Sequence, residues 1–138
     1  PIVPGKGIKV IEGNNLTIVA LGSKLTEAKE ASLILKDQHG ISSELIYYNS
    51  FKPFDAHLLQ ESVLKTKRFI TIEELSSHGG LFAQCLVSLT GIKFDACKQM
   101  AVNDFIKGYG THAELTKRAN LDTGALVQNS LQLLEKNS

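Results

Sequence analysis

The feature that most constrains the fold of this chain is a regular alternation of strand-like and helix-like segments. The stretch LTIVALG, at 16–22, is nearly all apolar and rich in branched side chains, as expected of a strand covered on both faces in a parallel sheet. In the segment 24–40 that follows, apolar residues recur every three or four positions, which predicts a helix ending near His39 and Gly40. Further strands are predicted at 8–11, 42–50, 68–74 and 94–102, and further helices over 51–67, 79–91, 112–118 and 122–135.

This alternation predicts one α/β domain. Strands that alternate with helices form successive right-handed crossovers, which build an open sheet with helices on both sides. We therefore expect a three-layer fold in which an open, mostly parallel five-stranded sheet carries helices on both faces. A chain of 138 residues has the usual size of one such unit, so residues 1–138 are expected to form a single domain.

Composition argues against several classes of partner. The 15 basic and 14 acidic residues give a net charge of +1, so neither nucleic acid nor an anionic membrane surface is favoured. No stretch has the length and apolarity of a transmembrane helix, and we expect a cytoplasmic protein. Because the chain begins at Pro1 and not at a methionine, we expect it to be a piece of something longer. Cys85 and Cys97 lie within apolar runs, which predicts buried thiols and not a disulfide or a zinc site.

The carboxyl edge of the predicted sheet is the place to look for a functional site. In open α/β sheets, ligands bind beyond the carboxyl ends of the strands, where the chain enters the next helix. Loops 49–54 and 76–80 lie on that edge, and glycines at a helix start can expose N–H groups to an anion or allow a second chain to approach. The candidate positions for an anion site or an interface are Gly22, Ser23, Glu73, His78, Gly79 and Gly80.

No catalytic set can be assembled from these residues. Glu73 and Glu74 are adjacent on a strand and point to opposite faces, so they do not form an acid/base pair, although one of them can accept hydrogen bonds from a helix start or a partner chain. The HGG at 78–80 is similar to the oxyanion motif of esterases, but the sequence has no GxSxG to supply a nucleophile. It also has no phosphate-binding glycine motif in the right context, and its histidines lack metal-binding spacing. The residues alone name no function.

The order of the segments, however, resembles the C-terminal domain of transketolase-type thiamine diphosphate enzymes. The resemblance begins with GKGIKVIEGNNLTIVALGSKLTEAKEAS at 5–32 and ends with GYGTHAELTKRANLDTGALV at 108–127. Between them, FKPFDAHLL is similar to the family's lysine-proline-apolar-aspartate helix start, and FITIEELSSHGGLFAQ is similar to its Glu-Glu/Asp and Gly-Gly pattern. The matching residues of these two motifs are Lys52, Pro53, Asp55, Glu73, Gly79, Gly80 and Leu81.

The resemblance implies a non-catalytic domain that packs within a larger enzyme and contributes to its dimer. In that family, two preceding domains or a separate subunit hold thiamine diphosphate and Mg²⁺, so this chain is expected to contribute no catalytic, cofactor-binding or metal-binding residue and to be inactive alone. The favoured parent is a transketolase, which moves a two-carbon ketol unit between sugar phosphates. The alternatives are a 1-deoxy-xylulose-5-phosphate synthase, a 2-oxo acid dehydrogenase beta subunit, or a free-standing module that binds a small anion at the strand-end edge.

Overall fold

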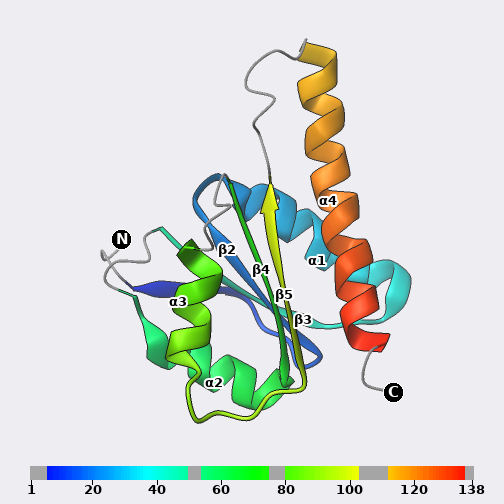
Figure 1. The fold of residues 1–138 in the computed structure, drawn as a ribbon. Helices are drawn as coiled ribbons and strands as arrows, with labels where there is room; N and C mark the ends of the chain where they lie inside the picture. The colour runs from blue at the N-terminus through cyan, green and yellow to red at the C-terminus, as the bar shows by residue number, and fades with distance from the viewer. Residues whose placement is uncertain (1–5, 50–53, 75–79, 103–111, 136–138) are drawn as a thin grey trace.

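The chain folds around a five-stranded sheet with the strand order β1-β3-β2-β4-β5 (Figure 1). The computed structural model describes residues 6–49, 54–74, 80–102 and 112–135, with side chains at 6–49, 54–73, 80–100 and 123–135. The strands are β1 (Gly7–Ile11), β2 (Leu16–Leu21), β3 (Ser43–Tyr48), β4 (Arg68–Glu74) and β5 (Ala96–Val102). The helices are the 3-10 turn η1 (Gly22–Lys24), α1 (Leu25–His39), α2 (Ala56–Thr66), α3 (Gly80–Ser88) and α4 (His112–Glu135).

The sheet is mixed but mostly parallel, as the sequence predicts. β2 lies at its centre and pairs in parallel with β3 and β4, and β4 pairs in parallel with β5. Only β1 runs antiparallel, at one edge, where it pairs with β3. Although β1 precedes β2 in the chain, the turn between them carries the backbone across β3, where Asn15 N–H donates to the carbonyl of Ser42 at 2.9 Å.

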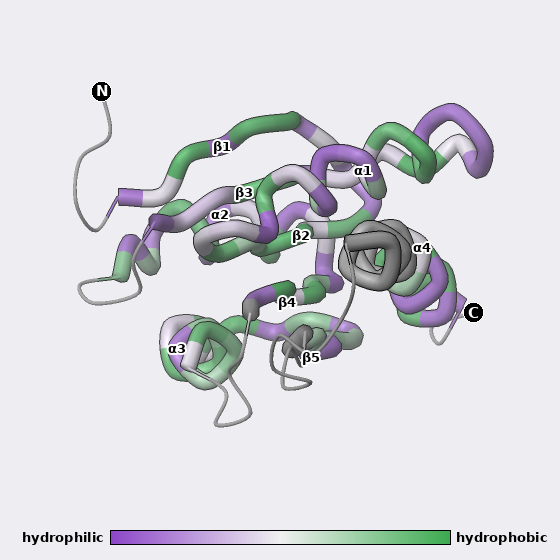
Figure 2. The backbone as a smooth tube through the Cα atoms, turned by 90° about the horizontal axis from the view of Figure 1, so that it is seen from above, coloured by the Kyte–Doolittle hydropathy of each residue, from purple (hydrophilic) through white to green (hydrophobic). Residues whose placement is uncertain are grey.

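Two apolar layers cover the sheet, one on each face (Figure 2). On the face covered by α1 and α4, side chains of β2 such as Ile18 pack against Leu35 and Leu126. On the opposite face, Val19 belongs to the layer formed with α2 and α3. β2 is therefore buried on both sides, which explains why its sequence is almost continuously apolar. This confirms the predicted three-layer arrangement.

The end of the first helix agrees with the sequence prediction, whereas the C-terminal helix differs from it. α1 ends at Gly40, which has a φ of +66° and donates its N–H to the carbonyl of Lys36. The prediction of two helices in the tail is wrong, because α4 runs unbroken from His112 to Glu135. The polar stretch at 116–122 interrupts the apolar periodicity, but it contains no proline or glycine and so does not break the helix.

Among the helices in the described ranges, none combines the length and apolarity needed to cross a membrane.

Candidate functional site

The carboxyl ends of β2 and β4 meet at one edge of the sheet. β2 continues into η1, which packs against β4, so Gly22 and Ser23 lie at the same edge as the end of β4 with Glu73. Gly80 is the first residue of α3, the helix that follows β4. His78 and Gly79 lie outside the described residues. The structure therefore brings together the end of β2 and the end of β4, as topology dictates for parallel neighbours.

The backbone conformation at position 22 requires a glycine. Its φ is +65°, a region that residues with a side chain rarely adopt, and a Cβ at this position would meet nothing within 4 Å. Gly22 and Ser23 are both exposed, whereas Lys24, the last residue of η1, is buried. The glycine therefore permits the sharp turn from β2 into α1.

Lys24 is a polar feature of this edge that sequence reasoning missed. It is 6% exposed, and its ammonium group lies 3.8 Å from the carboxylate of Glu27, one turn later in the chain. Glu27 is in the first turn of α1, where a negative charge also suits the helix dipole. The only hint in the sequence was a lysine directly after the Gly-Ser turn. The pair fixes the start of α1 over the end of the central strand.

Glu73 anchors the start of α3. Its side chain is buried, and both of its carboxylate oxygens lie within hydrogen-bonding distance of the Leu81 N–H, at 3.3 and 3.1 Å. The first N–H groups of a helix have no partner within the helix and carry partial positive charge, so a carboxylate is a suitable acceptor there. This is one of the two roles that the sequence left open for the glutamate pair. A carboxylate that is buried and bonded in this way is poorly placed to act as a general base.

The two thiols offer no nucleophile. Burial is the main reason that the pKa of Cys85 is raised, and the nearby charge of Glu73 raises that pKa further. Burial also raises the pKa of Cys97, which is half-buried. Because the thiolate is the reactive form, both groups are held in the unreactive thiol form near neutral pH. The prediction that the cysteines are free is confirmed, and that of full burial is confirmed for Cys85.

A second polar cluster lies at the opposite, amino edge of the sheet. Glu44, in β3, is 1% exposed and accepts hydrogen bonds from the Lys65 ammonium group at 2.6 Å and from the Gly13 N–H at 3.2 Å. Burial by itself would raise the pKa of Glu44, but the hydrogen bonds from Lys65, Ser62 and Gly13 outweigh it and lower that pKa. The cluster ties α2 and the β1–β2 turn to β3. Sequence reasoning missed it, since its only signal was one acid in an apolar strand.

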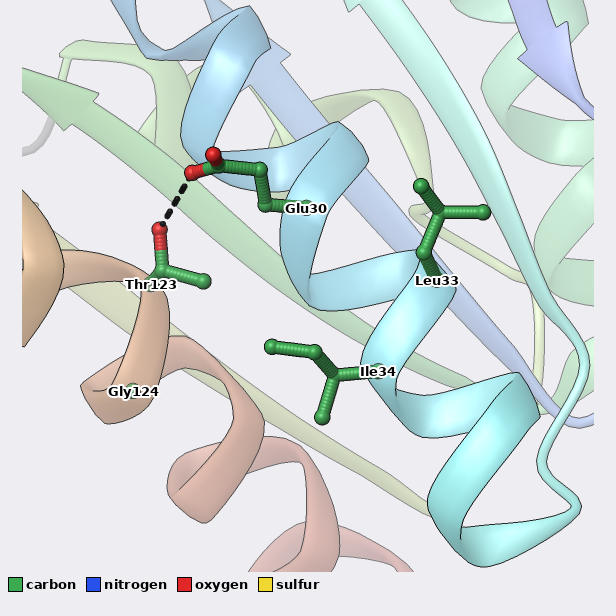
Figure 3. Close-up of a pocket in the computed structure, with 5 residues that line it drawn as sticks. All are labelled: Glu30, Leu33, Ile34, Thr123 and Gly124. Carbon is green, nitrogen blue, oxygen red and sulfur yellow. Dashed lines mark hydrogen bonds between the residues drawn. The ribbon is translucent and has the colours of Figure 1, made fainter.

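An open groove of about 470 Å³ lies between α1 and α4 (Figure 3). At one end the Thr123 hydroxyl donates to the Glu30 carboxylate at 3.0 Å, and Ile34 points between the two helices. Leu33 stands at the outer edge on α1, and Gly124 lies on α4. The groove is a feature of helix packing that no motif in the sequence indicated. In the described part of the chain, no three His, Cys, Asp or Glu side chains converge as a metal site would require.

The geometry defines a class of protein: an α/β domain in which the buried charged groups of the described ranges, Lys24, Glu44 and Glu73, hold strands and helices together. Residues 5–126 match the family model described as "Transketolase, C-terminal domain". The chain therefore belongs to the transketolase C-terminal domain family.

Curated relatives are similar to this chain over nearly its whole length. It is 29% identical over 137 residues to the 1-deoxy-D-xylulose-5-phosphate synthase of Halothermothrix orenii, covering 96% of this chain and 21% of that protein. It is 28% identical to a subunit of the apulose-4-phosphate transketolase of Phocaeicola vulgatus, over 97% of this chain and 42% of that relative. It is 31% identical to a putative transketolase C-terminal section of Methanocaldococcus jannaschii, over 96% and 41%. The chain thus spans between about a fifth and two-fifths of these relatives.

Solved structures agree with this family membership. A split-gene transketolase, described as an inactive β4 tetramer, superimposes with a TM-score of 0.78 at 35% sequence identity, over 96% of this chain and 44% of that one. A transketolase from Pichia stipitis, carrying an R525L substitution in its own numbering, shares the fold with a TM-score of 0.64 at 17% identity, over 98% and 20%.

Proposed function

We propose that this chain is the C-terminal packing and assembly domain of a transketolase, which transfers a two-carbon ketol unit between sugar phosphates. The observation that supports this most directly is the 35% identity to a split-gene transketolase. Similar coverage of one subunit of a second transketolase and of a transketolase C-terminal section points the same way. In a transketolase divided into subunits, this chain would be one subunit, which assembles with copies of itself and with a catalytic partner subunit.

In this proposal, thiamine diphosphate and Mg²⁺ bind to the parts of the enzyme that this chain does not span. The cofactor supplies the carbanion stabilisation that the reaction needs. The charged residues at the strand-end edge support this view, because Glu73 is bonded to the start of α3 and Lys24 to Glu27. We assign Gly22, Ser23 and Gly80, together with His78 and Gly79, to a surface that faces the cofactor-binding domains or subunit.

A 1-deoxy-xylulose-5-phosphate synthase is the second candidate for the parent enzyme. The similarity to the Halothermothrix orenii synthase over 137 residues favours it. The domain would have the same packing role in either enzyme, so the choice depends on the reaction of the complete protein. A free-standing module that binds a small anion at the Gly22–Ser23 edge is the third candidate.

The complete reading frame, expressed with any adjacent subunit gene, separates these candidates. It is supplied with thiamine diphosphate and Mg²⁺ and with either xylulose 5-phosphate plus an aldose phosphate or pyruvate plus glyceraldehyde 3-phosphate, and CO₂ is followed in both reactions. We expect ketol transfer without CO₂. Release of CO₂ from pyruvate, with condensation onto the triose phosphate, would assign the synthase instead, and no reaction in either mixture would favour the binding module.

Calorimetric titration of the 138-residue chain with thiamine diphosphate and Mg²⁺ tests where the cofactor binds. We expect no heat of binding from this chain alone. Binding at micromolar concentrations would contradict the proposed role and place a cofactor site within these residues.

A further inference from the structure

A chain of three buried hydroxyl groups runs from Glu44 to the end of α2. Thr17 in β2 pairs in register with Glu44 in β3, so the two side chains lie on the same face of the sheet. Ser62 and Thr66 are one turn apart on α2, which covers that face. The Thr17 hydroxyl oxygen lies 2.7 Å from that of Ser62 and 2.7 Å from that of Thr66. None of these three residues is more than 3% exposed.

The hydroxyl chain has an acceptor at each end. At one end Ser62 donates a hydrogen bond to the Glu44 carboxylate. At the other end, the Thr66 hydroxyl oxygen lies 3.0 Å from the carbonyl oxygen of Arg68, the first residue of β4. An ionised carboxylate and a carbonyl can only accept, so the three hydroxyl groups have three protons for four contacts. One contact is therefore without a proton whenever Glu44 is charged.

The distances indicate that the contact without a proton is the one with Arg68. The two contacts of Thr17 are 2.7 Å long, whereas the contact of Thr66 with the carbonyl is 3.0 Å long. Two hydroxyl oxygens approach to 2.7 Å when a proton lies between them. The negative charge of Glu44 also attracts the positive end of each O–H bond. All three hydroxyl groups therefore donate along the chain toward Glu44.

Protonation of Glu44 supplies the fourth proton. The carboxyl group can then donate to Ser62, each O–H bond turns toward the next oxygen, and the Thr66 hydroxyl donates to the Arg68 carbonyl. No proton leaves a hydroxyl group, so only the direction of the chain changes. Because the pKa of Glu44 is lowered, this reversal occurs in acid.

Two cations face Glu44 in the described part of the chain. The Lys65 ammonium group on α2 lies 2.6 Å from its carboxylate and the Lys9 ammonium group on β1 lies 4.0 Å from it. The turn between β1 and β2 contributes the Gly13 N–H, and β2 contributes the hydroxyl of Thr17. Both cations favour the charged form of Glu44, and so favour the chain that donates toward it.

We propose that this hydroxyl chain is a reversible device that transmits the charge of Glu44 to the turn between α2 and β4. The turn is sharp, since its Lys67 has a φ of +66°. Charged Glu44 holds the Thr66 proton within the chain, and neutral Glu44 releases it to the Arg68 carbonyl. The device belongs to this domain and does not depend on which enzyme contains it.

Carbon NMR titration of the Glu44 carboxyl group in the full chain tests the direction of the hydroxyl chain. Thr66→Val keeps the shape of the side chain and removes a hydroxyl that has no bond to Glu44. We expect it to raise the affinity of Glu44 for a proton by about 1.5–3-fold, because each bond of such a chain strengthens the next by roughly 10–30%. Ser62→Ala removes the direct bond and should raise that affinity by about tenfold.

The opposite direction of the chain predicts the opposite sign. If Thr66 donates to the Arg68 carbonyl when Glu44 is charged, Thr17 must donate to Thr66. Thr66→Val would then free the Thr17 proton for Ser62. The stronger bond from Ser62 would lower the affinity of Glu44 for a proton.

Two variants serve as controls. Thr66→Ser keeps the hydroxyl, so Glu44 should titrate as in the parent. Thr90→Val removes a hydroxyl that donates to the Val87 carbonyl at an exposed position, and it should leave the titration of Glu44 unchanged. Neutron diffraction from a crystal of the full chain at neutral pH needs neither a variant nor acid. We expect the hydroxyl deuterium of Thr66 to point toward Thr17.

Two results would overturn the inference. The first is a Thr66→Val variant in which the affinity of Glu44 for a proton falls or stays the same. The second is a Thr66 deuterium that points to the Arg68 carbonyl at neutral pH. Both measurements use this chain, whereas ketol transfer is measured on the complete enzyme, so the proposed function stands or fails separately.

Discussion

The ammonium group of Lys65 lies 2.6 Å from a carboxylate oxygen of Glu44, whose side chain is 1% exposed. The same oxygen accepts the N–H of Gly13, and the Lys9 ammonium group lies 4.0 Å away. One buried charge therefore connects β1, the turn after it, β3 and α2. A buried ion pair is weak evidence for stability, but removing one partner leaves a charge that water cannot reach.

Lys65→Met should lower the free energy of unfolding by about 1–3 kcal/mol. Loss of one partner of a fully buried pair costs about 3–5 kcal/mol, but Lys65 is 37% exposed and water screens part of the interaction. Methionine keeps the apolar stem, so the change reports mainly on the charge. Urea unfolding measures it, with Lys93→Met as the exposed control, expected to change stability by less than about 0.5 kcal/mol. Equal stability of the two variants would show that Glu44 does not depend on Lys65.

The stabilising effect of Glu44 should depend on pH in one direction. Its pKa in the folded protein is lowered from the ordinary value of 4.5, so the unfolded chain takes up a proton first as pH falls. The stability that this shift supplies is fully present above pH 4.5 and is lost as pH falls through the lower, folded pKa. Urea unfolding from pH 7 downward should therefore show the parent and Glu44→Gln converging in acid. If the parent instead gains stability relative to Glu44→Gln as pH falls, the pKa of Glu44 is raised in the folded protein.

Glu73→Gln should loosen the start of α3. Glutamine keeps an oxygen that can accept the Leu81 N–H but loses the negative charge that favours this position, at a cost of about 1–2 kcal/mol. Hydrogen exchange gives the local readout, since the Leu81 amide should exchange faster. Glu12→Gln, at an exposed position in the β1–β2 turn, is the control. Unchanged protection of Leu81 would show that the charge of Glu73 is not what holds the helix.

The sequence predicted the fold well where a local pattern has one physical cause. The continuous apolar run of β2 requires cover on both faces, and Gly40 has the positive φ that ends α1. The length of α4 was missed because helix continuation in a polar stretch depends on the absence of breakers more than on apolar periodicity. The antiparallel pairing of β1 with β3 depends on contacts across the sheet, which no local pattern records.

The polar sites were harder to predict, because burial decides what a charge does. Glu44 and Lys24 look like ordinary surface residues in the sequence, yet the fold buries both and gives each a partner of opposite sign. Glu73 was singled out from its place before the Gly-Gly turn, and its bond to Leu81 could be foreseen as one of two alternatives. The topology of parallel strands placed Gly22 correctly at the same edge.

Two glycines that look alike in the sequence should respond oppositely to alanine. A Cβ at Gly13 would lie 2.3 Å from the carbonyl carbon of Ser43, so Gly13→Ala must push the β1–β2 turn off β3 and weaken the bond to Glu44. We expect a loss of about 2 kcal/mol or more. Gly124 lies within α4 with nothing within 4 Å of a Cβ, so Gly124→Ala should stabilise the chain by about 0.5–1 kcal/mol. Thermal and urea unfolding, at concentrations where the chain is monomeric, measure both. Destabilisation by Gly124→Ala would show that a close neighbour fills this space, and a neutral Gly13→Ala would show that the turn can move away from β3 at little cost.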